Sequence, residues 1–204
     1  MRHPGIIASA ANIGAGGGGG GGEEDDDMTL LASGAIAAAT PEIQLELPAG
    51  YWAFTLRLMG IIASDQNNVT IQFSSDDGET WHEGVADYKT LLNYANTSMD
   101  NGPSTVKYFE DNQGYILYDA KPDPTAGVAS SATISIDPGS SGTFPQLRSD
   151  ALDQQSGFFP SITTWVVVCV AERVRQNRIR FQTYIGDEET LEGGAYALYG
   201  VPVV

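Results

Sequence analysis

Residues 69–81 read VTIQFSSDDGETW, a segment of alternating apolar and polar residues followed by a short polar stretch. An alternation with a period of two is typical of a β-strand that buries one face. In the polar stretch, the Asp76 carboxylate can accept hydrogen bonds from the backbone, and Gly78 can adopt the positive φ of a tight turn. The segment therefore predicts a β-hairpin. Its turn is built on Ser74, Asp76 and Gly78, and its returning strand begins at Thr80 and Trp81, with the indole capping the core.

The same kind of pattern continues along the chain from Pro41 onward. The expected strands cover residues 42–47, 51–62, 69–74, 88–94, 106–109, 114–118, 132–136, 162–171, 177–185 and 194–203. Clusters of Gly, Pro, Asn and Asp separate them, and only residues 171–176 indicate a helical turn. Many short strands with frequent turns predict an all-β, antiparallel sandwich formed by residues 41–204.

Residues 1–40 differ from the rest in composition and are expected to form an extended, glycine-rich N-terminal arm. Residues 1–13 are weakly apolar, residues 14–22 are glycine except for Ala15, and residues 23–27 are all acidic. A glycine run has high conformational entropy and adjacent carboxylates repel, so this part is not expected to fold alone. Two interpretations remain: a peptide anchor on a flexible tether, which the apolar tip favours, or a tail without a role. Residues 28–40 are either a first strand or a docking segment.

Composition narrows the classes of function. The 204 residues include 26 acidic and 10 basic side chains, a net charge of −16, whereas a nucleic-acid surface needs clustered Lys and Arg. No apolar run reaches the ~18 residues of a transmembrane helix, and the apolar patch near the N-terminus is too short for a signal peptide. Cys169 lies in an apolar run and is expected to be buried. We therefore expect no nucleic-acid partner, no membrane insertion and synthesis in the cytoplasm.

The spacing Ser-x-Asp-x-Gly-x-Thr-Trp in residues 74–81 resembles the Asp-box of sialidase propellers. A sialidase also needs repeated boxes and a propeller to hold its catalytic groups, but the chain has one box and no repeat of propeller length. The arginines at 173, 175, 178 and 180 cluster in sequence and are interpreted as salt-bridge residues, at the surface or between subunits. Because His3 and His82 are the only histidines, neither a histidine metal site nor a Ser-His-Asp triad is expected. We assign no catalytic residue and no cofactor.

Acidic pairs and aromatic residues are the remaining candidates for binding. Asp76/Asp77 and Glu188/Glu189 lie in predicted turns, where they are either solvated or ligands of Ca²⁺, and no metal site is assigned to them. Most aromatic residues of a sandwich of this size belong to its core. The candidates for stacking on a sugar ring are the ones expected on loops: Tyr94, Tyr115, Phe158 and Phe159.

Four short motifs occur in a characteristic order. They are LPAGY at residues 47–51, FSSDDGETW at 73–81, Asp87-Tyr88, and GGAYALYG at 193–200. In this order they resemble the β-jelly-roll fibre and decoration proteins of tailed bacteriophages and gene transfer agents. The resemblance covers the chain from Leu47 to its end.

The resemblance implies a jelly-roll fold and a virion structural protein, often a homotrimer, whose arm attaches to capsid, neck or tail proteins. The anchor would then comprise Met1, Arg2, His3, Pro4, Ile6, Ile7 and Ile13. The expected function is that of a non-enzymatic fibre or spike subunit. The alternatives are a receptor-binding head that recognises host surface glycans, a capsid decoration protein and, more remotely, a glycan hydrolase.

Overall fold

The computed structural model describes residues 28–64, 68–96, 105–117, 120, 130–154, 160–184 and 189–203. Twelve strands run through them: β1 (Thr29–Ala35), β2 (Glu42–Glu46), β3 (Tyr51–Ala63), β4 (Val69–Ser74), β5 (Tyr88–Asn96), β6 (Thr105–Asp111), β7 (Gly114–Leu117), β8 (Ser130–Asp137), β9 (Gln146–Gln154), β10 (Pro160–Cys169), β11 (Arg178–Thr183) and β12 (Leu191–Pro202). Within these residues the structure contains no helix, and so none able to cross a membrane.

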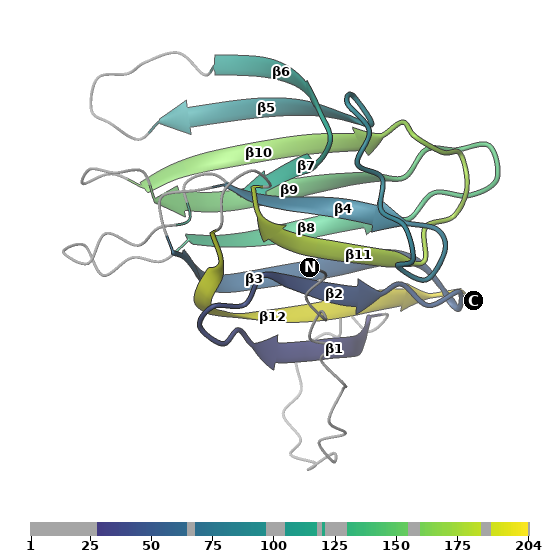
Figure 1. Cartoon of the computed structure of the whole chain (residues 1–204), viewed down its shortest axis with the longest axis horizontal. Helices are drawn as coiled ribbons and strands as arrows, with labels where there is room; N and C mark the ends of the chain where they lie inside the picture. Colours follow the sequence, from purple (N-terminus) through teal and green to yellow (C-terminus); the bar gives the residue numbers. More distant parts are fainter. Residues whose placement is uncertain are drawn as a thin grey trace, which may run out of the picture.

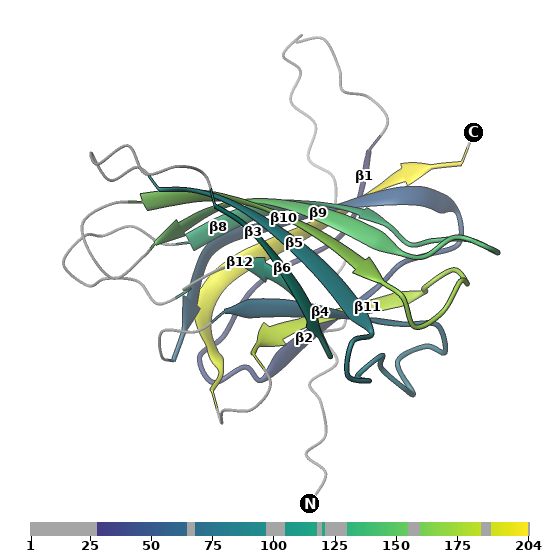
Figure 2. The ribbon, with the colours of Figure 1, turned by 90° about the horizontal axis from the view of Figure 1, so that it is seen from above.

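The strands form two antiparallel sheets that pack face to face. The large sheet has eight strands in the order β1-β12-β3-β8-β9-β10-β5-β6, and the small sheet has four in the order β2-β11-β4-β7. Figure 2 shows the small sheet as a second layer against the large one. The prediction of an all-β antiparallel sandwich is confirmed.

The connectivity of eight strands is that of a jelly roll. The antiparallel pairs β1–β12, β2–β11, β3–β8 and β4–β7 follow one another along a single two-stranded ribbon. Successive pairs belong alternately to the large and the small sheet, which is the arrangement produced when such a ribbon is rolled into a jelly roll (Figure 1). The jelly-roll topology thus follows from the strand order and agrees with the expectation from the sequence motifs.

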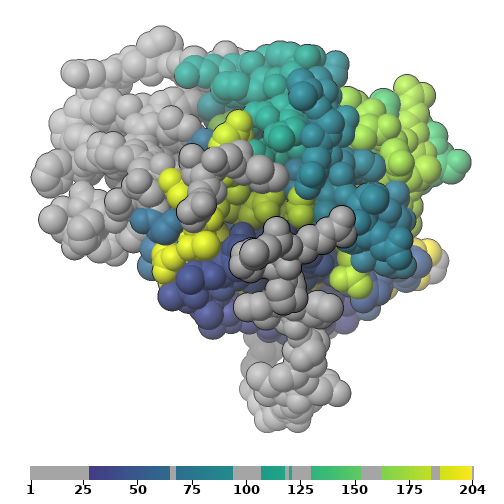
Figure 3. Space-filling model, viewed as in Figure 1, coloured from purple at the N-terminus to yellow at the C-terminus, as the bar shows by residue number. Residues whose placement is uncertain are grey.

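Two inserted hairpins extend the large sheet beyond the rolled ribbon. The β5–β6 hairpin lies between β4 and β7 in the chain, and the β9–β10 hairpin lies between β8 and β11. They join through the β10–β5 pairing, and β9 attaches them to β8. We call the four strands β9, β10, β5 and β6 the extension. In Figure 3 the teal β5–β6 segment and the purple β1 strand lie at opposite borders of the molecule.

The core lies between the sheets and follows the period-two alternation. Phe54, Leu56 and Leu58 of β3 and Ile179 and Phe181 of β11 are buried, while their neighbours along each strand are more exposed. Burial of these side chains is the main contribution to folding, at roughly 25 cal/mol for each Å² of apolar surface removed from water. Cys169 is buried in this core as expected.

Three expectations are corrected by the structure. Residues 29–35 pair with β12 in the large sheet, so the segment left open as a strand or docking piece is a strand, and residues 1–40 are not all arm. Residues 171–176 form no helix. Strand β9 was not predicted at all, because its inward residues are the unremarkable Leu147, Ser149 and Ala151 and its outward face carries charges.

Candidate functional site

The turn after β4 is held by its own side chains, as the sequence predicts. The Asp76 carboxylate accepts hydrogen bonds from the Thr80 hydroxyl at 2.5 Å, the Thr80 N–H at 2.9 Å and the Ser74 hydroxyl at 2.7 Å. The Gly78 N–H donates to the Ser74 Oγ at 3.0 Å, and Gly78 has a φ of +84°. Hydrogen bonds from Thr80 and then from Ser74 lower the pKa of Asp76 to about 2. Asp76 is therefore a structural anion.

The prediction that this turn closes a β-hairpin is wrong. β4 pairs with β11 on one side and with β7 on the other, and residues 75–87 cross instead to β5 in the large sheet. Trp81 starts no strand and is not part of the buried core. Its ring lies 4.7 Å from the Arg180 guanidinium, so it packs on the small sheet. A local motif specifies the turn, but it does not choose which strand the chain pairs with next.

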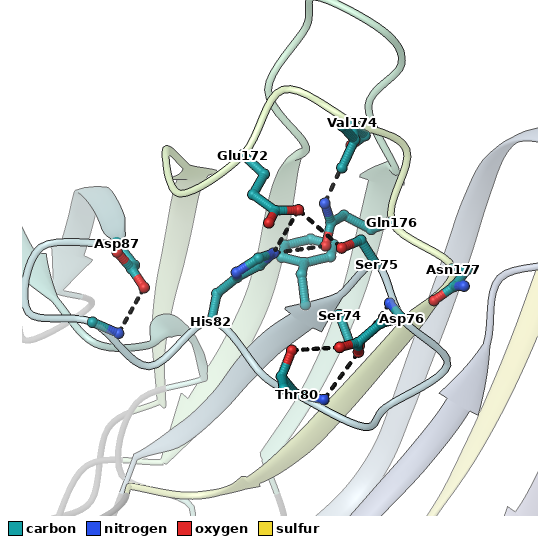
Figure 4. A network of polar contacts seen from close by, with 12 residues as sticks. Ser74, Ser75, Asp76, Thr80, His82, Asp87, Glu172, Val174, Gln176 and Asn177 are labelled. Carbon is teal, nitrogen blue, oxygen red and sulfur yellow. Dashed lines mark hydrogen bonds and ion pairs between the residues drawn. The ribbon is translucent and has the colours of Figure 1, made fainter.

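A polar network ties this turn to the loop between β10 and β11 (Figure 4). The His82 Nε2 lies 3.0 Å from the Gln176 Oε1 and 3.9 Å from the Glu172 carboxylate, which also accepts a hydrogen bond from the Ser75 hydroxyl at 2.9 Å. Gln176 is fully buried and donates to the Val174 carbonyl. The His82 side chain is 14% exposed and bridges two loops.

The clustered arginines have separate roles within the chain. Arg180 on β11 contacts Glu42 at 3.2 Å and Glu83, and its Nε donates to Gln72 at 2.7 Å. Arg180 therefore forms a salt bridge within the chain, but its side chain is only 12% exposed, so the pair with Glu42 is partly buried and not a surface pair.

The other arginines bind the backbone or aromatic rings. Arg175 donates to the carbonyls of Pro48 and Tyr51, both at 2.8 Å, and the Arg173 guanidinium lies 4.6 Å from the Phe144 ring. Arg178 and Arg180 do share one face of β11, on the outside of the small sheet opposite Glu46 and Gln44. The four residues therefore do not converge as a pocket for an anionic substrate would require.

Tyr115 lies in strand β7, which agrees with the strand expected at residues 114–118 and not with its choice as a loop residue. Its ring stacks on Trp165 at 5.7 Å and on Tyr184 at 5.8 Å, and Phe109 is a third neighbour at 5.9 Å. The hydroxyl donates to Asp111 at 2.7 Å. Burial, and then the hydrogen bond to Asp111, raise the pKa of Tyr115 well above its usual value. The ring and the hydroxyl are thus both engaged inside the chain.

The remaining predicted residues can be placed only in part. Tyr94 lies in β5, but its side chain is outside the described part of the structure. Phe158, Phe159, Glu188 and the anchor, tether and acidic run of residues 1–27 are also outside it. The Ca²⁺ alternative has no support in the described ranges: there, no three His, Cys, Asp or Glu side chains lie close enough to hold a metal ion.

A further group of residues was not singled out by the sequence. Five apolar side chains are exposed on the outward face of the extension: Leu91, Tyr108, Leu152, Ile162 and Val166. The sequence feature that indicates this surface is the apolar run of residues 165–170. A strand that is apolar on both faces is typically covered on both sides.

Comparison with protein families, with curated proteins and with solved structures finds no match to this chain. Assignment of a function therefore rests on the geometry and on the sequence motifs.

Proposed function

We propose that this protein is a non-enzymatic structural subunit of a tailed-phage or gene-transfer-agent particle. It acts as a fibre, spike or decoration subunit, with the jelly roll as its exposed head and the N-terminal arm as its attachment. The proposal places the protein in the virion, after synthesis in the host cytoplasm, with other virion proteins as its partners. Several copies, three in the form that the motifs suggest, would bind together.

The observation that carries the proposal is the rolled-ribbon connectivity of β1–β12, β2–β11, β3–β8 and β4–β7. Jelly rolls of this kind occur in viral capsid proteins, in lectins and in cupins. A fold does not by itself imply a function, so the side chains must choose between these classes. A cupin site needs clustered metal ligands, and the described residues contain no such cluster.

Titratable groups with shifted pKa values support a structural role. Asp76 holds a turn, Tyr115 stacks within an aromatic cluster, and Asp150 pairs with Arg148 on one strand. Burial alone would raise the pKa of Asp150, but hydrogen bonds from Arg148 and Thr164 lower it. Each of these shifts has a partner that stabilises the fold, whereas a catalytic group has its pKa set for a reaction.

The arm supplies the attachment in this proposal. An apolar peptide at residues 1–13, joined to the domain by glycines at 14–22, can order on a partner surface at the expense of chain entropy. Several arms that bind one particle together offset that loss, because after the first arm binds the others are held at high local concentration. This is the physical reason for expecting several copies on one particle.

The test compares the full chain with residues 28–204, each carrying a tag after Val204. Purified particles from cells that produce the tagged protein are imaged by electron microscopy with an antibody against the tag. We expect the full chain on particles, and we expect the truncated form to fold with the same melting temperature but to be absent from them. A full chain that never joins particles overturns the proposal, and a truncated chain that still joins them overturns the role of the arm.

A pair of matched variants separates the anchor from the tether. Replacing Ile6, Ile7 and Ile13 by Ser should abolish attachment, because it removes the apolar tip. Replacing three of the tether glycines by Ser keeps the chain length and flexibility, so attachment should remain. Equal loss in both variants would mean that the tip is not the anchor.

Glycan recognition is tested on the same protein with a glycan array. Because Tyr115 is engaged inside the chain, its removal would unfold the domain locally and would not report on binding. Trp52, whose side chain is 61% exposed, is the better residue to change. Binding that is lost in Trp52→Ala would move the assignment to a receptor-binding head, and hydrolysis of any glycan would move it to an enzyme.

A further inference from the structure

The outward face of the extension is apolar where an antiparallel sheet is usually polar. Its exposed side chains are Leu91 (43%), Tyr108 (57%), Leu152 (41%), Ile162 (56%) and Val166 (37%). The register places Tyr108 beside Leu91, Leu91 beside Val166, and Ile162 beside Leu152. The residues form two apolar groups on one face, one of Tyr108, Leu91 and Val166 and one of Ile162 and Leu152, with the row Asn93, Thr164 and Asp150 between them. Together we call the two groups the outer patch. Exposed apolar side chains gathered on one sheet face of an acidic protein favour an interaction surface.

The inner face of the same strands is already buried. Trp165 and Val167 of β10, Leu92 of β5 and Leu147 of β9 are buried, on strands that contact β7 of the small sheet. Strand β10 is thus apolar on both faces, a pattern found in strands that are covered on both sides. The small sheet covers the inner face of β10, and a partner molecule would have to cover its outward face.

The charges on this face cancel in pairs. Lys89 contacts Glu110 at 3.4 Å, and Arg148 contacts Asp150 at 3.0 Å. Lys89 and Glu110 face each other across β5 and β6, and Arg148 and Asp150 are two residues apart on β9. The outward charges of the extension therefore sum to zero, although the whole chain carries a net charge of −16.

Neutrality on this face favours a second copy of the chain as the partner. Two molecules of net charge −16 repel each other, and the repulsion is weakest where the facing surfaces carry no net charge. A basic partner protein would instead be drawn to unpaired carboxylates, and on this face both carboxylates already have a cationic neighbour.

The outward face of the extension is also large enough for a specific interface between two copies. Four strands about 4.8 Å apart and about eight residues long cover about 500 Å² on each copy. Two copies would then bury about 1,000 Å², near the lower limit for a specific interface. Contact that continues onto β8 would increase this area, since β8 lies beside β9 in the same sheet.

We propose that the outer patch on β9, β10, β5 and β6 is a self-association surface that packs against another copy of this chain. Two sheets can pack face to face at about 10 Å, with side chains from the facing surfaces interdigitating. The proposal stands apart from attachment through the arm, because a chain could self-associate through this face without joining any particle.

The test is the oligomeric state of the full chain, measured by sedimentation velocity from about 1 to 100 µM. The double variant Leu91→Gln/Ile162→Gln removes apolar surface without changing charge, and we expect it to weaken association by about a hundredfold. The control is Val85→Gln, at a loop residue that is 94% exposed and lies off the sheet, and it should leave association unchanged. Melting temperatures of all three proteins establish that each is folded.

Salt provides a second readout. Because the outer patch is neutral and the chain as a whole is acidic, added salt screens the repulsion between copies and should strengthen association. A full chain that remains monomeric at 100 µM overturns the proposal. So does an oligomer that the double variant leaves intact, or one that Val85→Gln disrupts equally.

Discussion

Gly78 in the turn after β4 offers a sharp test of how the turn is held. Its φ is +84°, in the left-handed region, and a Cβ at this position would lie 3.2 Å from the Arg178 Cδ and 3.3 Å from the Trp81 Cζ2. Alanine therefore meets two separate obstacles here, a strained backbone and close side chains. Two other glycines allow the two effects to be measured separately. Gly142 has a φ of +93° with nothing within 4 Å of an added Cβ, so only the backbone is strained there, and Gly50 has neither a positive φ nor an atom within 4 Å.

The expected changes in the free energy of unfolding follow from these differences. A left-handed alanine is disfavoured by about 1–2 kcal/mol, and the less flexible unfolded chain returns about 0.4–1 kcal/mol. Gly142→Ala should then destabilise by about 1 kcal/mol. Tight contacts add about 1 kcal/mol, the low end of the range for overpacking, so Gly78→Ala should lose about 2 kcal/mol. Gly50→Ala should be neutral or stabilise by about 0.5 kcal/mol.

The measurement is urea unfolding followed by tryptophan fluorescence, with melting temperatures as a second reading. For a domain of this size, 2 kcal/mol corresponds to a fall in melting temperature of about 4–8 °C. The order of stability should be Gly50→Ala, then Gly142→Ala, then Gly78→Ala. If Gly78→Ala is as stable as Gly142→Ala, the packing of Trp81 and Arg178 on the turn contributes nothing. If both match Gly50→Ala, the reasoning from φ is refuted.

Three further outcomes are expected from the pKa shifts and the packing. Hydrogen bonds from Thr80 lower the pKa of Asp76 from 3.8 to about 2. The ionised Asp76 carboxylate therefore stabilises the folded state fully above about pH 4, and this stabilisation is lost as the pH falls toward 2. Asp76→Asn should therefore melt below the wild type at pH 7 and approach it at pH 2, and a constant gap would contradict this. Burial raises the pKa of Cys169 to about 11, so a thiol reagent at pH 8 should react only after denaturation, and rapid labelling of the folded protein would argue against burial. Tyr115→Ala should lower the free energy of unfolding by about 3 kcal/mol and Tyr115→Phe by about 1 kcal/mol, because only the first removes the stacked ring; equal losses would show that the ring does not matter.

Strand positions were largely predictable, and the exceptions have physical reasons. β4 alternates strictly between apolar and polar residues, and β3 has Phe54, Leu56 and Leu58 at every second position, so the ends of both strands are predicted within one residue. β9 has the charged residues Arg148 and Asp150 on its outward face, and its inward Ser149 and Ala151 are small, so its composition is that of a polar loop. The small residues of β1 fit either an edge strand or a docking segment, and the sequence alone does not decide between them.

Side-chain contacts between distant parts of the chain could not be predicted from the sequence. Tyr115 looked like a loop residue with a free ring, whereas β10 and Tyr184 bring rings against it from elsewhere in the chain. His82 lies beside Gln176 only because the loops before β5 and after β10 meet at one end of the sandwich. No spacing within a short segment records such contacts.

The sequence by itself determined the all-β class, the positions of most strands and the chemistry of the Asp76 turn. These depend on neighbours within a few residues: alternation along one strand, and hydrogen bonds between Ser74, Asp76 and Thr80. Only the tertiary structure decided which strands are neighbours. It places β5 in a different sheet from β4 and brings Leu91 beside Val166, so that residues from two hairpins share one exposed apolar group. The physical reason is that strand pairing is chosen by the burial of whole sheets against each other, and that free energy belongs to no single segment.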